Sequence, residues 1–194
     1  MRPPTQRDMQ AETRRNQLLD IALTLFAERG VENVSIKDLA AEAEVAQGLI
    51  YYYFKSKDEL VAAVFQQHNP LPDFEAIMKQ LSDLPAREGL TLFAQRLVAL
   101  LDEKRPVLRL LVRELLSPRS ASLTSVLSMR AEVMAQLGRY FQSRVAAGEL
   151  RPHEPLVPIQ IIVGSLLTLS LLDQPLEPFV PKLIDTVLEG IQTT

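Results

Sequence analysis

The stretch VSIKDLAAEAEVAQGLIYYYFKSKDEL, residues Val34–Leu60, carries the clearest structural signals in this chain of 194 residues. Ser35 stands directly before an apolar helical repeat and has Asp38 three residues on, which is close to a capping box. Ser56 precedes the next repeat and has Glu59 three residues on, which matches a capping box fully. Two short helices joined by a tight turn, behind a supporting first helix, predict a helix-turn-helix.

Three consecutive tyrosines, Tyr51–Tyr53, fall in the second of these helices, although the whole chain has only four. Successive helical residues turn by about 100°, so no single face can bury all three. With Ile50 and Phe54 on the core side, Tyr52 points about 200° away from Ile50, and the other two tyrosines lie on the shoulders. Such an outer face is poorly solvated in a monomer. It suits a recognition helix, because phenols bind phosphates and their rings contact sugars and thymine methyl groups.

Helical periodicity covers the rest of the sequence, and we find no convincing strand or hairpin signal. The chain is therefore predicted to be all-α. We expect a flexible N-terminal arm over residues 1–13, a three-helix helix-turn-helix domain over 14–68 and a larger helical domain over 69–194. The last two helices are predicted at Leu156–Leu172 and Phe179–Ile191.

Composition limits the kind of protein. The chain is 47% hydrophobic and has no cysteine, which excludes disulfides and thiolate metal sites. Its first residues contain no apolar signal segment, so we expect a cytoplasmic location. The 18 uncharged residues between Glu154 and Asp173 reach the lower limit of a membrane span, but they include two prolines and several polar residues. A helix buried on most of its circumference is the favoured interpretation.

Enzyme chemistry has little support. His68 and His153 are the only histidines, they are far apart in sequence, and we interpret both as solvated. The sequence contains no nucleophile elbow, phosphate loop or metal-ligand cluster. We therefore expect no catalytic residue, no cofactor and no metal.

The part of the chain from about Gln17 to Phe65 resembles the DNA-binding domain of the TetR family of transcriptional regulators. The resemblance rests on five spaced residues: Tyr51, Phe54, Ser56, Lys57 and Leu60. It implies a homodimeric repressor that is released from a palindromic double-stranded DNA operator by a small-molecule effector. The larger domain would then serve effector binding and dimerisation. The alternative is a helical interaction or scaffold protein that does not bind DNA.

The resemblance also implies roles for individual residues. Tyr51 and Lys57 match phosphate-binding positions, and the remaining DNA-binding candidates match positions that face the DNA backbone or the groove. Each has a solvated surface residue as its alternative. The full set is Ser35, Lys37, Gln47, Gly48, Leu49, Tyr51, Tyr52, Tyr53 and Lys57.

Three residues depart from the family pattern. Glu44 stands where glycine is usual in the turn, Ala46 replaces a helix-capping serine or threonine, and Leu49 replaces a small or polar residue. The lost cap costs on the order of 1 kcal/mol unless another group compensates. Net charge gives little support for DNA binding, because residues 1–60 hold eight basic and ten acidic side chains. Binding would then depend on locally placed cations and helix ends instead of a broad basic field.

Candidates in the larger domain are of two kinds. Apolar residues and a basic stripe suggest an effector pocket. The alternatives are a packed core for the apolar residues and a solvated face, paired with Glu114, for the basic ones. The pocket candidates are Phe93, Leu97, Arg109, Arg113, Met129, Met134 and Phe141. The last two helices are expected to pair with a second subunit, with the monomer's own core as the alternative. The interface candidates are Gly164, Leu167, Leu171, Val180, Ile184, Val187, Leu188 and Ile191.

Overall fold

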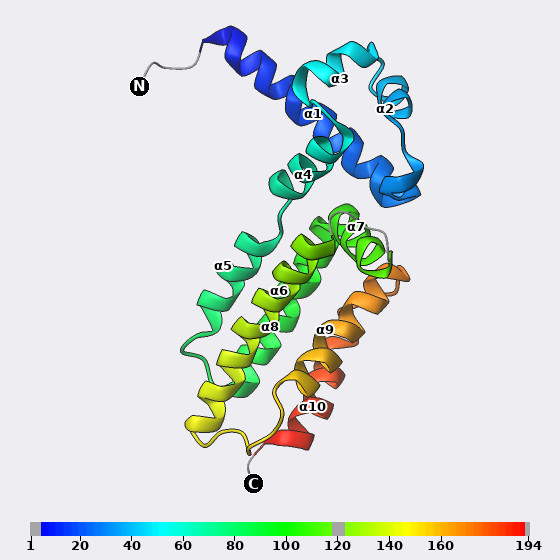
Figure 1. The fold of residues 1–194 in the computed structure, drawn as a ribbon. Coiled ribbons are helices and arrows are strands. Elements are labelled where there is room, and N and C mark those ends of the chain that lie inside the picture. Colours follow the sequence, from blue (N-terminus) through cyan, green and yellow to red (C-terminus); the bar gives the residue numbers. More distant parts are fainter. Residues whose placement is uncertain (1–4, 118–122, 193–194) are drawn as a thin grey trace. The chain divides into compact units, whose positions relative to one another are not determined.

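The structure of the protein is a computed structural model that describes residues 5–117 and 123–192. Within these ranges the regular elements are helices, apart from one isolated β-bridge between Leu150 and Gln192, which confirms the all-α prediction. Figure 1 shows the helices α1 (Gln6–Arg29), α2 (Ile36–Glu42), α3 (Gln47–Tyr53), α4 (Lys57–Gln67), α5 (Leu71–Leu81), α6 (Ala86–Glu103), α7 (Arg105–Leu116), α8 (Leu123–Ala146), α9 (Leu156–Leu171) and α10 (Val180–Ile191), with the short 3-10 helix η1 (Val31–Asn33) after α1.

Contacts divide the chain into two units. Unit 1 comprises Met1–Asn69 together with Pro106–Val126, and unit 2 comprises Pro70–Arg105 together with Leu127–Thr194. The sequence suggests a second domain running without interruption from residue 69. In the structure, most of α7 instead belongs to unit 1, so the chain passes between the units three times.

Unit 1 is built around α1, which packs against α2 and α4, while α2 packs against α3. The apolar repeat of α1 is buried there, with Leu19 and Phe26 shielded completely from solvent. Ile50 of α3 and Leu60 of α4 complete the same core. This packing holds the two short helices of the helix-turn-helix against one long support.

Unit 2 is built around α6, which packs against α5, α9 and α10, while α9 also packs against α10. The helices of this unit run side by side in Figure 1. Phe93 of α6 meets Phe74 of α5 edge to face, with 6.1 Å between the ring centroids. Phe93 and Phe141 of α8 are among the most completely buried side chains of the protein.

The first helix starts earlier than the sequence suggested. A flexible arm was predicted through residue 13, but α1 begins at Gln6. The Thr5 hydroxyl accepts from the Asp8 N–H at 3.2 Å, and the Asp8 carboxylate accepts from the Thr5 N–H at 2.9 Å. This capping box satisfies the helix start locally, so the predicted arm is wrong for the described part of its range.

Two arginines of α7, Arg105 and Arg113, have separate partners within the protein. Arg105 contacts the carboxylates of Asp102 and Asp173 in unit 2. Arg113 donates to the carbonyl oxygen of Glu28 at 2.8 Å, and thereby satisfies an acceptor in the last turn of α1. Arg113 thus has a structural partner within unit 1.

The histidines were expected to be solvated, and the structure corrects this. The His68 Nε2 atom lies 3.3 Å from a carboxylate oxygen of Asp20, and its side chain is 20% exposed. The His153 ring is half-buried and meets Phe141 edge to face at 5.6 Å. Both rings therefore take part in tertiary packing.

The apolar segment after Glu154 forms α9, which is 16 residues long. Among the helices of residues 5–117 and 123–192, none combines the length and the apolar character needed to cross a bilayer.

Tyr140 of α8 approaches α6 so closely that only glycine fits beneath it. Its side chain is buried, and its hydroxyl lies 3.4 Å from the carbonyl oxygens of Leu84 and Pro85. Burial raises the pKa of Tyr140 to about 12. A Cβ atom at Gly89 would lie 1.9 Å from the Tyr140 hydroxyl oxygen, a distance that real atoms cannot adopt.

We predict that Gly89→Ala destabilises the protein by about 1–3 kcal/mol, because Tyr140 must leave its position. The matched control is Gly138→Ala on α8, where an added Cβ would meet no other atom within 4 Å. That change should stabilise the protein by about 0.5–1 kcal/mol, since alanine loses less backbone entropy in a helix. Urea unfolding measures both, and equal stabilities of the two variants would contradict the close approach.

Candidate nucleic-acid interface

The start of α2 is fixed by a complete capping box. The Ser35 hydroxyl accepts from the Asp38 N–H at 3.1 Å, and the Asp38 carboxylate accepts from the Ser35 N–H at 2.8 Å. Hydrogen bonds from the Ser35 side chain and backbone lower the pKa of Asp38. The predicted contact residue Ser35 therefore has a structural role of its own, and Lys37 lies exposed beside it.

The turn between α2 and α3 is a Schellman motif. The Val45 N–H donates to the Ala40 carbonyl at 2.9 Å, and the Glu44 N–H donates to the Ala41 carbonyl at 3.2 Å. Glu44 occupies the left-handed position of this motif, with a φ of 53°. The sequence departure at this residue therefore places a side chain where glycine is favoured, and the turn forms nevertheless.

Helix α3 has one buried edge and one free face. Ile50 and the residue after the helix, Phe54, are 2% and 1% exposed. Tyr51 is 52% and Tyr52 is 77% exposed, while Tyr53 is half-buried and meets the Tyr52 ring edge to face at 5.1 Å. The arrangement predicted from helical geometry is therefore present.

The N-terminal end of α3 is open. Ala46 supplies no side-chain cap, and Gln47 and Gly48 are exposed. A Cβ atom at Gly48 would meet nothing within 4 Å, so the protein's own packing does not require glycine there. The absence of a side chain leaves this part of the α3 backbone accessible to another molecule.

The start of α4 is capped in a different way from the prediction. The Ser56 hydroxyl accepts from the Glu59 N–H at 3.1 Å, as expected, but the Glu59 carboxylate accepts from the Lys55 N–H at 2.8 Å. The first-turn N–H groups that remain add a partial positive charge next to the half-buried Lys57. An anion at this end of α4 would contact both the free N–H groups and the Lys57 side chain.

Comparison with known proteins agrees with this geometry. The family described as "Bacterial regulatory proteins, tetR family" matches residues 18–64. Residues 18–64 therefore form a TetR-family segment. This confirms, for this part of the chain, the resemblance drawn from the tyrosine, serine and lysine spacing.

Individual relatives differ in how much of the chain they match. The repressor KstR2 of Rhodococcus jostii is 40% identical over 67 residues, which cover 34% of this chain and 33% of the relative. The matched segment thus spans about a third of that relative. The regulator HbdR of Aromatoleum sp. strain CIB is 29% identical over 160 residues, covering 78% of this chain and 66% of HbdR.

Solved structures show the same fold over nearly the whole chain. KstR2 of Mycobacterium tuberculosis superimposes with a TM-score of 0.73 and 20% identity, covering 93% of this chain and 96% of that one. The TetR-family regulator PfmR of Thermus thermophilus gives a TM-score of 0.71 at 20% identity, covering 89% and 97%.

Ser35 lies directly before α2, and the other eight DNA-binding candidates fall on α2, α3 and the start of α4. Six are exposed, and Leu49, Tyr53 and Lys57 are half-buried. Sequence reasoning missed Arg15 of α1, whose guanidinium carbon lies 5.2 Å from the centre of the Phe54 ring. The sequence signal for Arg15 is that a basic residue lies on the apolar stripe of α1, one turn before the buried residues Leu18 and Leu19.

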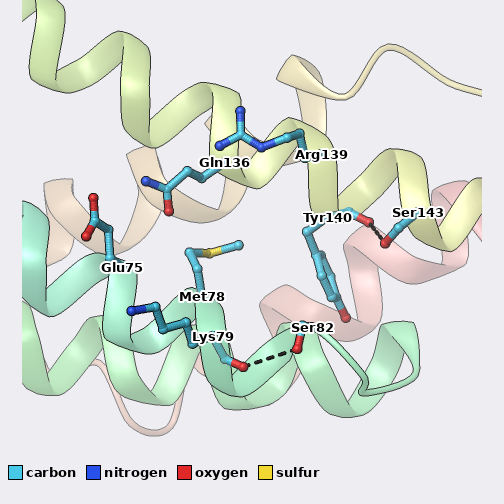
Figure 2. A pocket seen from close by; sticks show the side chains of 8 residues that line it. All are labelled: Glu75, Met78, Lys79, Ser82, Gln136, Arg139, Tyr140 and Ser143. Carbon is cyan, nitrogen blue, oxygen red and sulfur yellow. Dashed lines mark hydrogen bonds between the residues drawn. The ribbon is translucent and has the colours of Figure 1, made fainter.

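The effector candidates are divided between the two units. Phe93, Leu97 and Phe141 are buried in unit 2, Met129 and Met134 are half-buried, and Arg109 and Arg113 lie on α7. A groove of about 480 Å³ lies elsewhere in unit 2, between α5 and α8, and Figure 2 shows its lining side chains. Among the described residues, these are Glu75, Met78, Lys79, Ser82, Gln136, Arg139, Tyr140 and Ser143.

The dimer candidates divide into two groups. On α10, Val180, Ile184, Val187 and Leu188 are buried, because α10 packs against α6 and α9 of its own chain. Gly164 of α9 is exposed, and the other three candidates, Leu167, Leu171 and Ile191, are half-buried. The large apolar side chains that α9 exposes are Leu156, Val157, Ile161 and the adjoining Leu172.

We predict that Glu44→Gly stabilises unit 1 by about 1 kcal/mol, because it relieves a left-handed conformation at the end of α2. Glu42→Gly serves as the matched control, since Glu42 is helical and exposed, and glycine there should destabilise by a similar amount. Guanidinium unfolding gives the sign of each change. Destabilisation by both substitutions would show that the turn does not need a left-handed residue.

Proposed function

We propose that this protein is a DNA-binding transcriptional regulator. The observation that carries the proposal is the two-sided α3 helix, which buries Ile50 and Phe54 and exposes Tyr51 and Tyr52. Exposed aromatic rings next to an open backbone are poorly suited to water and well suited to a DNA groove. The similar proteins KstR2, a repressor, and HbdR, a regulator, support the same function. A scaffold protein would give no reason for this face.

In the proposed mechanism, α3 enters the major groove while the flanking helices bind the DNA backbone. Tyr51 donates its hydroxyl to a phosphate, and Lys57 and the first turn of α4 bind the same strand. Ser35 and Lys37 approach the backbone from α2. The bases are read by the outer face of α3, namely Gln47, Gly48, Leu49, Tyr52 and Tyr53.

The balance of charges in the helix-turn-helix region determines how this binding works. Acidic side chains outnumber basic ones in residues 1–60, so long-range attraction to DNA is weak. Affinity must then come from a few cations at short range. We expect the salt dependence of binding to reflect a small number of phosphate contacts.

We predict that Tyr51→Phe and Lys57→Gln each weaken binding to operator fragments selected from a random pool by the unmodified protein. Tyr51→Phe removes one charge-assisted hydrogen bond, which is worth about tenfold in affinity or more. Lys57→Gln should also reduce the slope of log K against log salt by about 0.9 per bound subunit. Fluorescence anisotropy over a range of salt concentrations measures both effects.

The matched control is Lys182→Gln, which removes one positive charge from an exposed position on α10. It should leave affinity and salt slope unchanged. If Tyr51→Phe and Lys57→Gln bind the selected DNA as the unmodified protein does, the proposed use of α3 and α4 is wrong, and the scaffold alternative gains support.

We also propose that two copies of the chain form a homodimer through the outer face of α9. Val157, Ile161 and Gly164 lie at positions i, i+4 and i+7 of one helix face, and Leu172 continues it. Contiguous exposed apolar side chains on a monomer are typical of protein interfaces. The buried side of α10 then supports α9 from within the chain instead of contacting the partner.

We predict that Ile161→Asp raises the dimer dissociation constant at least about tenfold, because the interface would have to bury an unpaired carboxylate. Sedimentation velocity over a range of protein concentrations measures the dimer fraction. Thr186→Asp, at an exposed position of α10, is the control and should leave the dimer intact. Equal dissociation constants for the two variants would exclude the α9 face.

Effector binding belongs to the same proposal. A small molecule bound by unit 2 would favour a dimer in which the two α3 helices are wrongly spaced for the operator, and so release a repressor. The groove between α5 and α8 supports this role, because Met78 adapts to varied shapes and Lys79 and Arg139 supply positive charge. Such a regulator acts where the DNA is, which agrees with a cytoplasmic location.

A further inference from the structure

Arg15 occupies an unusual place on α1. It precedes the buried residues Leu18 and Leu19 by one turn on the same side of the helix, where an apolar residue would continue the core. Its guanidinium carbon lies 5.2 Å from the centre of the Phe54 ring, within the range of a cation–π interaction. Arg15 is half-buried and covers the almost fully buried Phe54.

The charge of Arg15 is not neutralised within the described part of the protein. No carboxylate among the described residues lies within ion-pair distance of it, and its N–H groups donate to none of the described protein groups. Arg15 is also not among the buried side chains left without a partner. Its N–H groups therefore reach solvent, while the ring beneath holds the guanidinium in place.

The position of Phe54 brings this guanidinium to the end of α3. Phe54 directly follows α3 and directly precedes Lys55, in the segment that leads into α4. Lys57 and the free N–H groups of the first α4 turn lie within a few residues of the ring that Arg15 covers. Two acids follow Lys57: Asp58 is exposed, and Glu59 already accepts the Lys55 N–H at 2.8 Å.

We propose that Arg15 binds a DNA phosphate and so extends the DNA interface from the helix-turn-helix onto α1. The inference rests on the proposed DNA-binding function. The Phe54 ring positions the guanidinium before DNA arrives, so little side-chain freedom is lost on binding. In a helix-turn-helix region with more acidic than basic side chains, one such cation is a substantial part of the electrostatic attraction.

A purely structural role is the competing explanation, in which Arg15 only shields Phe54 from water. Two substitutions separate the roles. Arg15→Met keeps a flexible apolar cover over the ring and removes the charge. Arg15→Lys keeps the charge and loses the planar group that stacks on the ring.

The experiment measures binding of the full chain to a fluorescent 30-base-pair duplex of random sequence over a series of KCl concentrations. We expect Arg15→Met to lower the slope of log K against log salt by about 0.9 per bound subunit, and to weaken binding equally across sequences. Arg15→Lys should keep the slope of the unmodified protein. Arg96→Gln, an exposed change on α6 that lowers the net charge equally, should have no effect.

Two outcomes would overturn the inference alone. One is an unchanged slope in Arg15→Met while Lys57→Gln still reduces it. The other is loss of DNA binding and a lower melting temperature in Arg15→Lys with normal behaviour of Arg15→Met, which would show that Arg15 only covers the ring. If the unmodified protein binds neither this duplex nor the selected operator fragments, the proposed function fails, and the inference fails with it.

Discussion

Burial of Ile50 and Phe54 is the constraint on which the rest of unit 1 depends. These two side chains fix the rotation of α3 about its axis, and a seven-residue helix with one buried edge has no freedom to turn. The rotation decides which tyrosines face outward and where the Phe54 ring lies. It also sets the position of the chain as it enters α4, and with it the position of Lys57. The exposed face is therefore a consequence of the buried one.

Much of unit 1 could be predicted because its signals are local. Ser35 with Asp38 identifies a helix start within four residues, and the spacing from Ile50 to Phe54 identifies the buried edge of α3. The departure at Glu44 was also visible, since a turn of this kind needs a left-handed residue. The early start of α1 was missed although Thr5 and Asp8 give the same kind of signal as Ser35 and Asp38.

The sequence could not decide which element covers the buried side of a helix. Periodicity shows that α10 has a buried side, but it does not show whether α6 and α9 of the same chain or a second subunit covers it. The charge repeat on α7 has the same ambiguity, because Arg105 and Arg113 share a spacing and have partners in different units. Such pairings are tertiary contacts. Arg113 and Glu28 are far apart in sequence, so no local sequence pattern predicts that they meet.

The assignment of α7 to unit 1 has a consequence for how the protein can be divided. A fragment that ends at Asn69 would keep the whole helix-turn-helix but lose Arg113, which satisfies carbonyl groups at the end of α1. The Glu28 carbonyl would then lose its Arg113 donor, although Gly30 and Asn33 would still satisfy the carbonyls of Phe26 and Arg29. Unit 1 is therefore discontinuous in sequence, and an exchange of this unit between relatives must carry two separate pieces of sequence.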